Sequence, residues 1–470
     1  AEVALRAAKR LGEREVAIYK ARNAVNNKAA NAAALLEAVP SEARGDAGYV
    51  FSRAQHLRRA DRVAEAARLM LGASRDPNVI QDTDEWWVER RLLARKLLDI
   101  GDPQTAYQIA RDAAEPAKEN YRAEHEFTAG WIALRFLNNP AAALKHFARV
   151  GRGTANPITL ARASYWQGRA AEALGRQSEA RAHYEAAARF PTAYYGQLAR
   201  AKIGVTEIGL RRPVSLDGAH LAAVRNLDIV RAAEMLYASG NRDLVPAMVA
   251  DMADRVTDVP ALAAIARICE RHQDARSVLL IGKHVLARGV PFDHFAFPTI
   301  GVPAYSAVGP AIDRSVVFAI ARQESHFNQR TVSSAKALGL MQVTPPAGRY
   351  VAKKFGVSFD QKRLLSDPVY NTQMGAAELG DLLKDYRGSY VLSFAAYNAG
   401  RGRVREWVQR FGDPRDPNVD PIDWVERIPF SETRNYVQRV MENMQVYRAR
   451  FGATSELMIE ADMRRGATGL

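Results

Sequence analysis

One glutamate, Glu324, has the clearest chemical character of any residue in the sequence. It lies in the run RSVVFAIARQESHF, where an apolar stripe at helical spacing passes through Val317, Ile320 and Ala321. Glu324 takes the next position on this stripe, and Asp313 stands where it can cap the first turn. Because desolvation disfavours the anion, burial would raise the pKa of this carboxyl and let it act as a general acid. The alternative is a boundary glutamate whose stem packs while its carboxylate reaches water.

A second polar segment follows in the run SSAKALGLMQVTPPAG. Gly339 stands just before Met341 and Gln342, which predicts a turn that brings the backbone close to a ligand. The Gln342 amide offers both a donor and an acceptor, a combination suited to the acetamido group of a sugar. A tight loop with a capping glutamine is the alternative.

Two further segments mark a helix end and a helix start. In SFAAYNAGRGRV, Tyr397 and Asn398 precede Gly400, a typical helix C-terminal signal, so both can face a groove, or Asn398 can simply cap the turn. In ERIPFSETRNYVQRVMENM, Ser431 is the expected N-cap of a helix. Tyr436 lies at the edge of that helix's apolar stripe, which contains Val437, Val440, Met441 and Met444. From there the Tyr436 hydroxyl can reach a buried acid.

The elements that must carry these residues are helices throughout. From the N-terminus to residue 212 the sequence is rich in alanine, with apolar residues at helical spacing. Similar units, each of two helices joined by a short polar turn, begin at Trp86, Ala129 and Ala163. Equivalent residues in the second helices are 37 positions apart: Ala106, Ala143 and Ala180, with Phe147 and Tyr184 at the same spacing. This period predicts paired helices stacked into a superhelix, similar to tetratricopeptide repeats.

Proline and glycine divide the rest of the chain. Helical patterns continue from residue 213 until Pro291, Pro298, Gly301 and Pro303 interrupt them. We therefore predict an all-α protein with three domains and a tail. They are an α-superhelical domain at 1–212, a helical linker domain at 213–300, a catalytic domain at 301–452 and a C-terminal tail at 453–470.

Composition excludes several classes of protein. The 470 residues are 48% hydrophobic and 25% charged, as in an ordinary folded chain and unlike a disordered one. The single cysteine, Cys269, excludes an intrachain disulfide and a cysteine-based zinc site, and we expect no metal and no cofactor. No apolar run is long enough to predict a membrane-spanning helix. The net charge of +14 favours anionic partners, but no zinc-finger spacing or continuous basic helix supports nucleic-acid binding.

The chemistry-bearing segments together resemble a known family. The run ARQESHFNQRTVSSAKALGLMQVTP resembles the signature of bacterial lytic transglycosylases of the soluble Slt type. AAYNAG and IPFSETRNYVQRV are similar to later motifs of that family and occur in the same order, and PTAYYGQLARAKIG near Tyr194 resembles part of its helical domain. The resemblance implies a lysozyme-like, mostly helical catalytic domain, joined through a helical linker to a doughnut-shaped α-superhelix.

The resemblance also implies an activity. Members of the family are lyases that cleave the β-1,4 bond between N-acetylmuramic acid and N-acetylglucosamine in peptidoglycan without water, leaving a 1,6-anhydromuramoyl end. In this scheme Glu324 first protonates the leaving oxygen and then, as a carboxylate, takes a proton from the muramoyl C6 hydroxyl. No Asp or Glu occurs from Ser325 through Phe359, which suits a single-carboxylate scheme, although Asp360 or Glu432 can still fold into the groove.

The same resemblance assigns supporting roles. Two residues would orient or hydrogen-bond the acid: Ser325 and Tyr436. Four would line the saccharide groove: Met341, Gln342, Tyr397 and Asn398. Two weaker candidates would contact the stem peptide: Arg322 and Glu432. For these two the alternatives are a surface arginine and a first-turn glutamate favoured by the helix dipole.

Departures from the family pattern and competing functions remain open at this point. Lys336 stands where many members have glycine, and Thr344 where many have methionine, so substrate fit and inhibitor binding are less certain than the reaction. The alternatives are a hydrolytic muramidase of the same fold and a non-enzymatic scaffold that binds peptidoglycan or proteins.

Location and partners follow from the resemblance rather than from a visible signal. The N-terminus AEVALRAAKR lacks the basic and apolar regions of a signal peptide, so the chain is cytoplasmic or has lost a leader. The substrate of the family implies the periplasm. We expect a monomer that is not membrane-spanning and that acts on peptidoglycan glycan strands. The superhelix is a candidate surface for other cell-wall enzymes.

Overall fold

The computed structural model describes residues 2–212, 216 and 218–467, and these residues form helices and loops. Within them the only extended pairings are isolated bridges, which join Glu207 to Glu456 and Leu338 to both Val332 and Val343. The predicted all-α class is therefore confirmed. No helix among the described residues is long and apolar enough to cross a membrane.

The chain divides into two compact units. The first comprises Ala1–Thr154 with Trp166–His183, and the second comprises Ala155–Tyr165 with Tyr184–Leu470. The division runs through two helices of the predicted superhelical region. The predicted boundaries at residues 212, 300 and 452 stay predictions, because this division into units does not test them.

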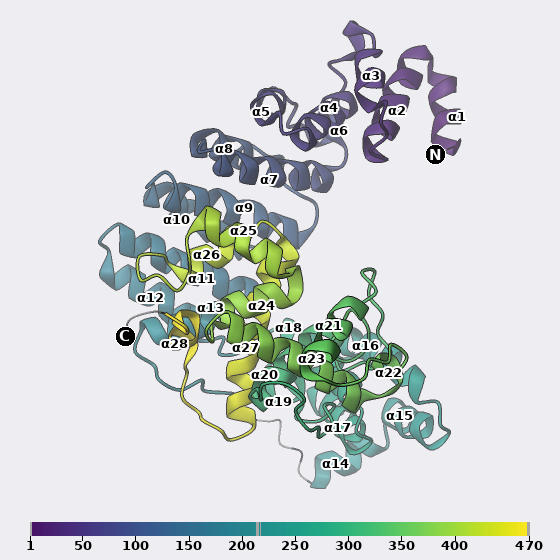
Figure 1. The fold of residues 1–470 in the computed structure, drawn as a ribbon, viewed down its shortest axis with the longest axis vertical. Helices are drawn as coiled ribbons and strands as arrows, with labels where there is room; N and C mark the ends of the chain where they lie inside the picture. The colour runs from purple at the N-terminus through teal and green to yellow at the C-terminus, as the bar shows by residue number, and fades with distance from the viewer. Residues whose placement is uncertain (1, 213–215, 217, 468–470) are drawn as a thin grey trace. The chain divides into compact units, whose positions relative to one another are not determined.

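The first unit is built from consecutive helices (Figure 1, purple to blue). They are α1 (Glu2–Leu11), α2 (Glu13–Asn26), α3 (Ala32–Glu37), η1 (Ser41–Ala43), α4 (Ala47–Arg59), α5 (Val63–Leu71), α6 (Pro77–Ile80), α7 (Thr83–Asp99), α8 (Pro103–Arg111), α9 (Glu119–Arg135), α10 (Pro140–Val150), and parts of α11 (Pro157–Ala173) and α12 (Gln177–Ala188). Neighbours pack in pairs: α1 with α2, α4 with α5, α7 with α8, and α9 with α10.

The repeated alanines explain this pairing. Ala106 in α8, Ala143 in α10 and Ala180 in α12 are all buried, and a methyl side chain at each position lets helices approach closely. Short polar turns separate the helices because Asp102 and Asn139 cap the next helix, accepting from the backbone N–H of residues 105 and 142 at 3.0 Å. The predicted helix pairs of the repeats are thus confirmed.

The second unit contains the remaining helices (Figure 1, teal to yellow). They are α13 (Tyr194–Lys202), α14 (Gly218–Arg225), α15 (Asp228–Ala238), η2 (Arg242–Leu244), α16 (Val245–Arg255), α17 (Val259–Arg271), α18 (Ala275–Ala287), α19 (Asp293–Ala296), α20 (Arg314–Ser325), α21 (Pro345–Phe355), α22 (Arg363–Ser366), α23 (Pro368–Asp385), α24 (Tyr390–Ala399), α25 (Arg401–Phe411), α26 (Pro421–Arg427), α27 (Ser431–Arg450) and α28 (Ile459–Arg464).

Helix α27 is the central element of this unit. It packs against α20 and α24, and its predicted apolar stripe is fully buried at Val437, Val440, Met441 and Met444. Its start differs from the prediction: Ser431 is the first helical residue, and Phe430 takes the cap position without a side-chain hydrogen bond. The backbone at the preceding proline-containing turn sets this start, since Phe430 is extended with φ −84° and ψ 113°.

The segment around Tyr194 and the C-terminal tail both fasten onto α27. The Tyr194 N–H donates to Glu442 at 2.6 Å, and the Gln197 amide donates to the Glu442 carbonyl at 3.1 Å. Within the predicted tail, residues 459–464 form α28, in which Asp462 is buried and bonded to Gln445 and Arg448. Residues 468–470 lie outside the described residues.

Candidate active site

Helix α20 presents Glu324 in its last turn. The predicted cap is confirmed, because Asp313 accepts the Ser315 N–H at 2.7 Å. The stripe of Val317, Ile320 and Ala321 is buried, as expected, and Glu324 itself is only half-buried. The helix ends at Ser325, and the next residue, His326, takes the left-handed conformation with φ 52°. Glu324 is therefore held on a rigid helix end with its carboxyl partly open to solvent.

The surroundings of Glu324 favour its protonated form. Burial is the main cause that raises the pKa of Glu324 to about 8, a value that already includes the opposing effect of the Tyr436 hydroxyl and the smaller raising effects of the Glu378 and Glu432 charges. A carboxyl with this pKa carries its proton at neutral pH, which is the state that a general acid needs.

Two tyrosines border the acid. Tyr436 on α27 is 4% exposed, and its hydroxyl interacts with Glu324 strongly enough to oppose the rise in pKa. That hydroxyl nevertheless makes no hydrogen bond of ordinary distance and angle with any described residue, so the contact with the acid is loose. Tyr397 on α24 donates its hydroxyl to the Met341 carbonyl at 2.8 Å. For both tyrosines burial raises the pKa well above its usual range, so both keep their protons.

Ser325 has a different partner from the expected one. Its hydroxyl donates to the backbone carbonyls of Leu340, at 2.7 Å, and Ala321, at 3.2 Å, and forms no hydrogen bond with Glu324. The loop after α20 returns to the end of that helix, so the Leu340 carbonyl accepts the Ser325 hydroxyl in place of the Glu324 carboxyl. Ser325 thus fastens the loop to the helix that carries the acid.

The loop after α20 is held by its own polar groups. Met341 is fully buried, so it supports the groove from behind instead of lining it, and its N–H donates to the Asn371 side chain at 2.8 Å. The Gln342 amide donates to the Thr331 carbonyl at 3.1 Å and the Gly339 carbonyl at 2.8 Å. The Gln342 amide nitrogen therefore fits the alternative of a capping glutamine better than it fits a contact with a sugar.

Gly339 permits a close approach, but to protein and not to a ligand. It has φ +76°, and a Cβ at this position would overlap the Leu364 carbonyl and the Asn371 amide. Asn371 in turn donates to the Leu338 and Leu364 carbonyls at 2.8 and 2.9 Å. The sequence analysis missed Asn371, which organises the loop from α23.

Asn398 and Glu432 mark the meeting of α24 and α27. Asn398 is half-buried, and its side-chain oxygen accepts the Thr433 hydroxyl at 2.6 Å. Glu432 is exposed in the first turn of α27, close enough to influence the pKa of Glu324. Both residues therefore lie near the acid.

Arg322 is turned away from any ligand. It is 7% exposed, donates to the Ala296 carbonyl at 2.9 Å and the Asn443 side chain at 2.8 Å, and stacks 4.1 Å from the Phe297 ring centre. Helical register places Arg322 on the face of α20 that packs into the protein. The contact with a stem peptide stays a prediction.

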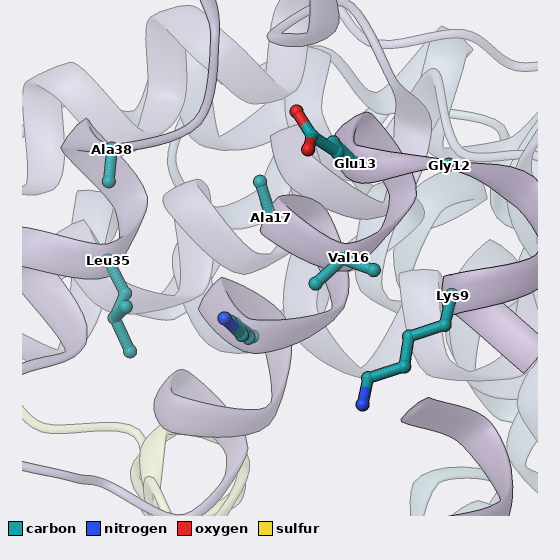
Figure 2. Close-up of a pocket in the computed structure, with 8 residues that line it drawn as sticks. Lys9, Gly12, Glu13, Val16, Ala17, Leu35 and Ala38 are labelled. Carbon is teal, nitrogen blue, oxygen red and sulfur yellow. The ribbon is translucent and has the colours of Figure 1, made fainter. Parts of the chain in front are cut away.

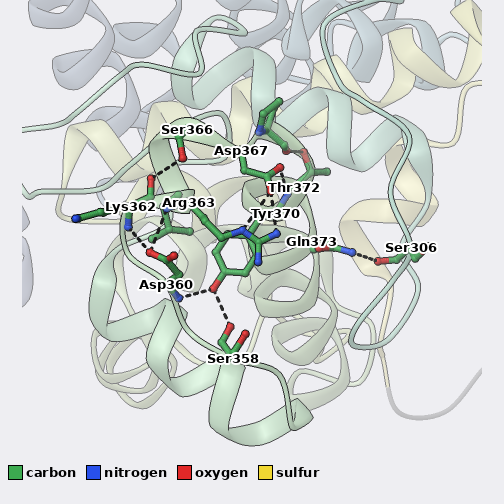
Figure 3. A network of polar contacts seen from close by, with 12 residues as sticks. Ser306, Ser358, Asp360, Lys362, Arg363, Ser366, Asp367, Tyr370, Thr372 and Gln373 are labelled. Carbon is green, nitrogen blue, oxygen red and sulfur yellow. Dashed lines mark hydrogen bonds and ion pairs between the residues drawn. The ribbon is translucent and has the colours of Figure 1, made fainter.

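Asp360 is also removed from the list of partner carboxylates. It lies in a polar network at the start of α23 (Figure 3), where it accepts the Lys362 N–H at 2.8 Å. Tyr370 accepts the Asp360 N–H and donates to the Ser358 carbonyl, both at 3.0 Å, while Asp367 caps α23 by accepting the Tyr370 N–H. This network stabilises a turn and a helix start.

Glu378 on α23 is a site residue that the sequence analysis missed. It is half-buried and forms no hydrogen bond or ion pair with any residue that the structure describes. Burial is the main cause that raises its pKa to about 7, a value that includes a lowering effect of Arg401 and a smaller raising effect of Asp381. The available signal was similar to that for Glu324: a carboxylate within a helical run of small and apolar residues, GAAELGDLL, in which Asp381 is the other acid.

The two departures from the family pattern have separate settings. Thr344 is the cap of α21, since its hydroxyl accepts the Ala347 N–H at 3.3 Å. Lys336 is exposed and has φ +61°, a conformation that glycine adopts more easily. Thr344 is thus explained by local structure, while Lys336 places an exposed cation on the loop surface.

Two pockets lie outside this site. One, of about 540 Å³, is in the first unit among α1–α3 (Figure 2) and is lined by residues that include Lys9, Glu13 and Lys20. The other, of about 520 Å³, is lined mainly by apolar residues between Val302 and Phe318. Neither pocket contains a predicted site residue. Within the described part of the chain, no group of three or more His, Cys, Asp or Glu side chains is arranged to hold a metal.

Two family models match the second unit. Residues 303–419 match the transglycosylase SLT domain, and residues 427–456 match the soluble lytic transglycosylase helical domain. These ranges hold the motifs around Glu324, Tyr397 and Tyr436 that carried the resemblance, whereas the segment near Tyr194 lies outside them. The resemblance to soluble lytic murein transglycosylases is therefore confirmed.

Curated relatives match the same region. The chain is 36% identical over 158 residues to the soluble lytic murein transglycosylase of Escherichia coli (strain K12), covering 33% of this chain and 24% of the relative. It is 32% identical over 195 residues to membrane-bound lytic murein transglycosylase C of Actinobacillus succinogenes, covering 37% of this chain and 51% of the relative. The chain thus spans about a quarter of the first relative's length and about half of the second's.

Solved structures extend the likeness in fold to nearly the whole chain. An inactive mutant of the lytic transglycosylase Slt from Pseudomonas aeruginosa superposes with a TM-score of 0.63 at 23% identity, covering 94% of this chain and 74% of that one. The 70 kDa soluble lytic transglycosylase from Escherichia coli gives 0.52 at 22% identity, covering 93% and 78%. This likeness agrees with the predicted all-α fold over nearly the whole chain.

Proposed function

We propose that this protein is a lytic transglycosylase that cleaves the β-1,4 bond between N-acetylmuramic acid and N-acetylglucosamine in murein and leaves a 1,6-anhydromuramoyl end. One observation carries the proposal. Glu324 stands at the end of α20, half-buried, with a pKa raised to about 8 and two protonated tyrosines beside it. Such a carboxyl can donate a proton to a glycosidic oxygen at neutral pH.

The reaction balances with Glu324 as the single proton carrier. Its proton goes to the glycosidic oxygen as the bond from C1 to that oxygen breaks, and the substrate's own N-acetyl oxygen stabilises C1. The Glu324 carboxylate then takes the proton of the C6 hydroxyl while that oxygen forms a bond to C1. Because the acceptor belongs to the same sugar, this closure is unimolecular and needs no bound water.

Neighbouring residues support this chemistry in different ways. The Tyr436 hydroxyl faces Glu324 loosely and can follow the carboxyl as it gains and loses its proton. Ser325 and Tyr397 hold the loop through the carbonyls of Leu340 and Met341. Asn398 and Glu432, which border the acid, are our candidates for contacts with the sugar and the stem peptide.

The wider setting follows from the proposed reaction. We propose a superhelical domain at 1–212, a linker domain at 213–300 and a catalytic domain at 301–452, acting as a monomer on glycan strands in the periplasm. Other cell-wall enzymes are candidate partners of the superhelix. The net charge of +14 suits an anionic cell-wall polymer.

A second candidate is a hydrolytic muramidase, and Glu378 is the observation that favours it. Hydrolases that use two carboxylates need a second one to activate water or attack C1. Glu378 supplies an unpaired carboxyl near Glu324 from a helix far along the chain. The difference between the two candidates is whether water or the C6 hydroxyl is the acceptor.

Mass spectrometry of products released from purified peptidoglycan tests the proposal. Wild type is expected to release muropeptides with 1,6-anhydromuramic acid, and Glu324→Gln is expected to release none. Glu406→Gln is the matched control, because it makes the same chemical change on α25, where Glu406 pairs with Arg403 and Arg410 at 3.1 and 3.2 Å.

Each other outcome has a definite meaning. Products heavier by one water in place of anhydro ends would identify a hydrolase. Release of nothing by wild type, from a substrate that a known muramidase digests, would leave the non-enzymatic scaffold. Circular dichroism of the Glu324→Gln variant checks that a loss of products is not a loss of fold.

A further inference from the structure

Helix α23 contributes one face to the site, and Glu378 is the chemical group on it. Gly375 precedes Glu378 by one turn, and a Cβ on Gly375 would lie 2.6 Å from the Met341 Cβ and 3.1 Å from the Tyr397 hydroxyl. This face of α23 therefore abuts the loop and the tyrosine that border the acid. Since residues three apart share a helix face, Glu378 extends from the same side.

Four side chains from four helices form one cluster here. The charge of Glu378 acts on Glu324 of α20, on Tyr397 of α24 and on Tyr436 of α27, raising the pKa of each. Electrostatic interactions fade over about 8–10 Å at physiological salt, so an influence on all three, together with the packing of the Gly375 face against Met341 and Tyr397, places Glu378 in their neighbourhood. The mechanism proposed above uses Glu324 and the tyrosines and leaves Glu378 without a task.

The cation nearest to Glu378 is committed elsewhere. Arg401 on α25 donates to Asp381 at 2.8 Å and to Asp385 at 3.1 Å. It lowers the pKa of Glu378 without forming an ion pair with it, whereas Asp381, one turn along α23, raises that pKa. When Glu378 ionises, its negative charge is therefore not cancelled by a direct partner, and its field reaches Glu324.

We propose that Glu378 is a positioning residue of this site, a second carboxylate whose negative charge holds Glu324 in its proton-bearing form. The inference rests on the proposed function, in which Glu324 must carry a proton before it meets the substrate. Glu378 exchanges no proton with the substrate in this role. It acts through Glu324.

Coupling between the two carboxyls gives the charge of Glu378 its effect. The pKa values of both are raised, to about 7 for Glu378 and about 8 for Glu324, so both groups titrate near neutral pH. Two interacting carboxyls titrate in steps, and the first charge formed makes the second loss harder. Once Glu378 is ionised, its charge therefore favours the protonated form of Glu324.

The other groups around Glu324 cannot replace this effect. Glu432 on α27 also raises the pKa of Glu324, but its carboxylate is exposed, so water and salt screen it. Tyr436 on the same helix lowers that pKa. Glu378 is half-buried, so water and salt screen its charge less than that of Glu432. Substitution of Glu378 is therefore expected to lower the pKa of Glu324 more than substitution of Glu432.

The test is the pH dependence of kcat/KM for wild type and Glu378→Gln on purified peptidoglycan, since this quantity reports ionisations of the free enzyme. The substitution removes the negative charge, the Glu324 anion becomes easier to form, and the alkaline limb moves to lower pH. A shift of about one pH unit corresponds to a loss of about fivefold at pH 8 and less than about twofold at pH 6. Glu406→Gln should leave the limb where it is.

A purely structural role predicts a different pattern. Loss of packing would lower the rate by the same factor at every pH and leave the limb unmoved, and that result would overturn the inference. Glu378→Asp keeps the charge on a shorter side chain and should return the alkaline limb of the kcat/KM profile most of the way to its wild-type pH. Reducing-end products that disappear only in Glu378→Gln would also overturn it, because Glu378 would then be the base that activates water.

A measurement without substrate separates the inference from the proposed function. Carbon NMR of glutamate-labelled full-length protein, with the Glu324 signal assigned through Glu324→Gln, titrates the acid directly. A lower pKa of Glu324 in Glu378→Gln supports the inference even if wild type releases no product. An unchanged pKa refutes the inference even if wild type is an active transglycosylase.

Discussion

The second unit holds two kinds of buried carboxyl group, and their difference separates chemistry from structure. Asp462 on α28 is 3% exposed and is bonded to Gln445, at 2.6 Å, and to Arg448. Glu324 and Glu378 are less buried by area, yet neither has an ion pair among the described residues, and burial raises both pKa values. A carboxylate with a cation stays ionised and holds elements together, whereas a carboxyl without one keeps its proton and can give it away.

The same contrast occurs within a single helix. On α23, Asp381 is 1% exposed and bonded to Arg401, Lys354 and Tyr350. Glu378, one turn earlier, has no such partner and faces the acid. Position on the helix therefore decides whether a carboxylate is a structural anchor or part of the site.

The largest expected effect is on stability, when the ion-paired carboxylate Asp462 loses its cation. Arg448→Met leaves Asp462 buried without its cation, and removal of one partner of a buried pair costs about 3–5 kcal/mol of unfolding free energy. Urea denaturation measures this loss. Glu324→Gln, which breaks no ion pair, is the control and should not destabilise the fold. Equal losses in the two variants would contradict the distinction between them.

A smaller effect concerns Glu324, the carboxyl without a cation, and appears as a dependence of stability on pH. The native state holds the Glu324 proton up to about pH 8, whereas the unfolded chain releases it near its ordinary pKa of 4.5. The native state thus binds more protons between these values, and this group's contribution to the unfolding free energy falls as pH rises through that window.

Glu324→Gln removes the titration, so the variant should match wild type near pH 4 and exceed it at pH 8. We expect a gain of about 1–3 kcal/mol at pH 8, reduced from the full linkage value because the side chain is partly reached by solvent. Urea denaturation across this pH range provides the measurement. A stability difference that does not change with pH would show that Glu324 ionises normally.

The smallest effect compares the two tyrosines of the site. Tyr397→Phe deletes a hydrogen bond to the Met341 carbonyl and should cost about 1 kcal/mol of unfolding free energy. Tyr436→Phe deletes no well-formed bond, so stability should hardly change, while the pKa of Glu324 and the alkaline limb of activity rise. Thermal denaturation and a pH profile distinguish the pair. A larger stability loss in Tyr436→Phe would show that its hydroxyl is a structural group.

Much of the fold and of the acid could be predicted from local sequence. The Asp313 cap, the stripe that leads to Glu324 and the buried stripe of α27 depend on residues within a few positions of one another. The 37-residue alanine period predicted the helix pairs, because each small residue marks a close approach between two helices that are consecutive in the chain. The start of α27 was wrong by one residue, since a side-chain cap was expected where the backbone supplies none.

Only the tertiary structure decided what each polar group contacts. Helix register turned Arg322 into the protein, the returning loop took the Ser325 hydroxyl, and Gln342 closed on its own loop. The approach of α23 brought Glu378 to Glu324 from beyond the carboxylate-free stretch. Periodicity and capping are short-range and can be read along the chain, whereas the partner of a side chain depends on which helices pack together. The sequence by itself therefore predicted which residue is the acid, and the packing of α20, α23, α24 and α27 determined its surroundings.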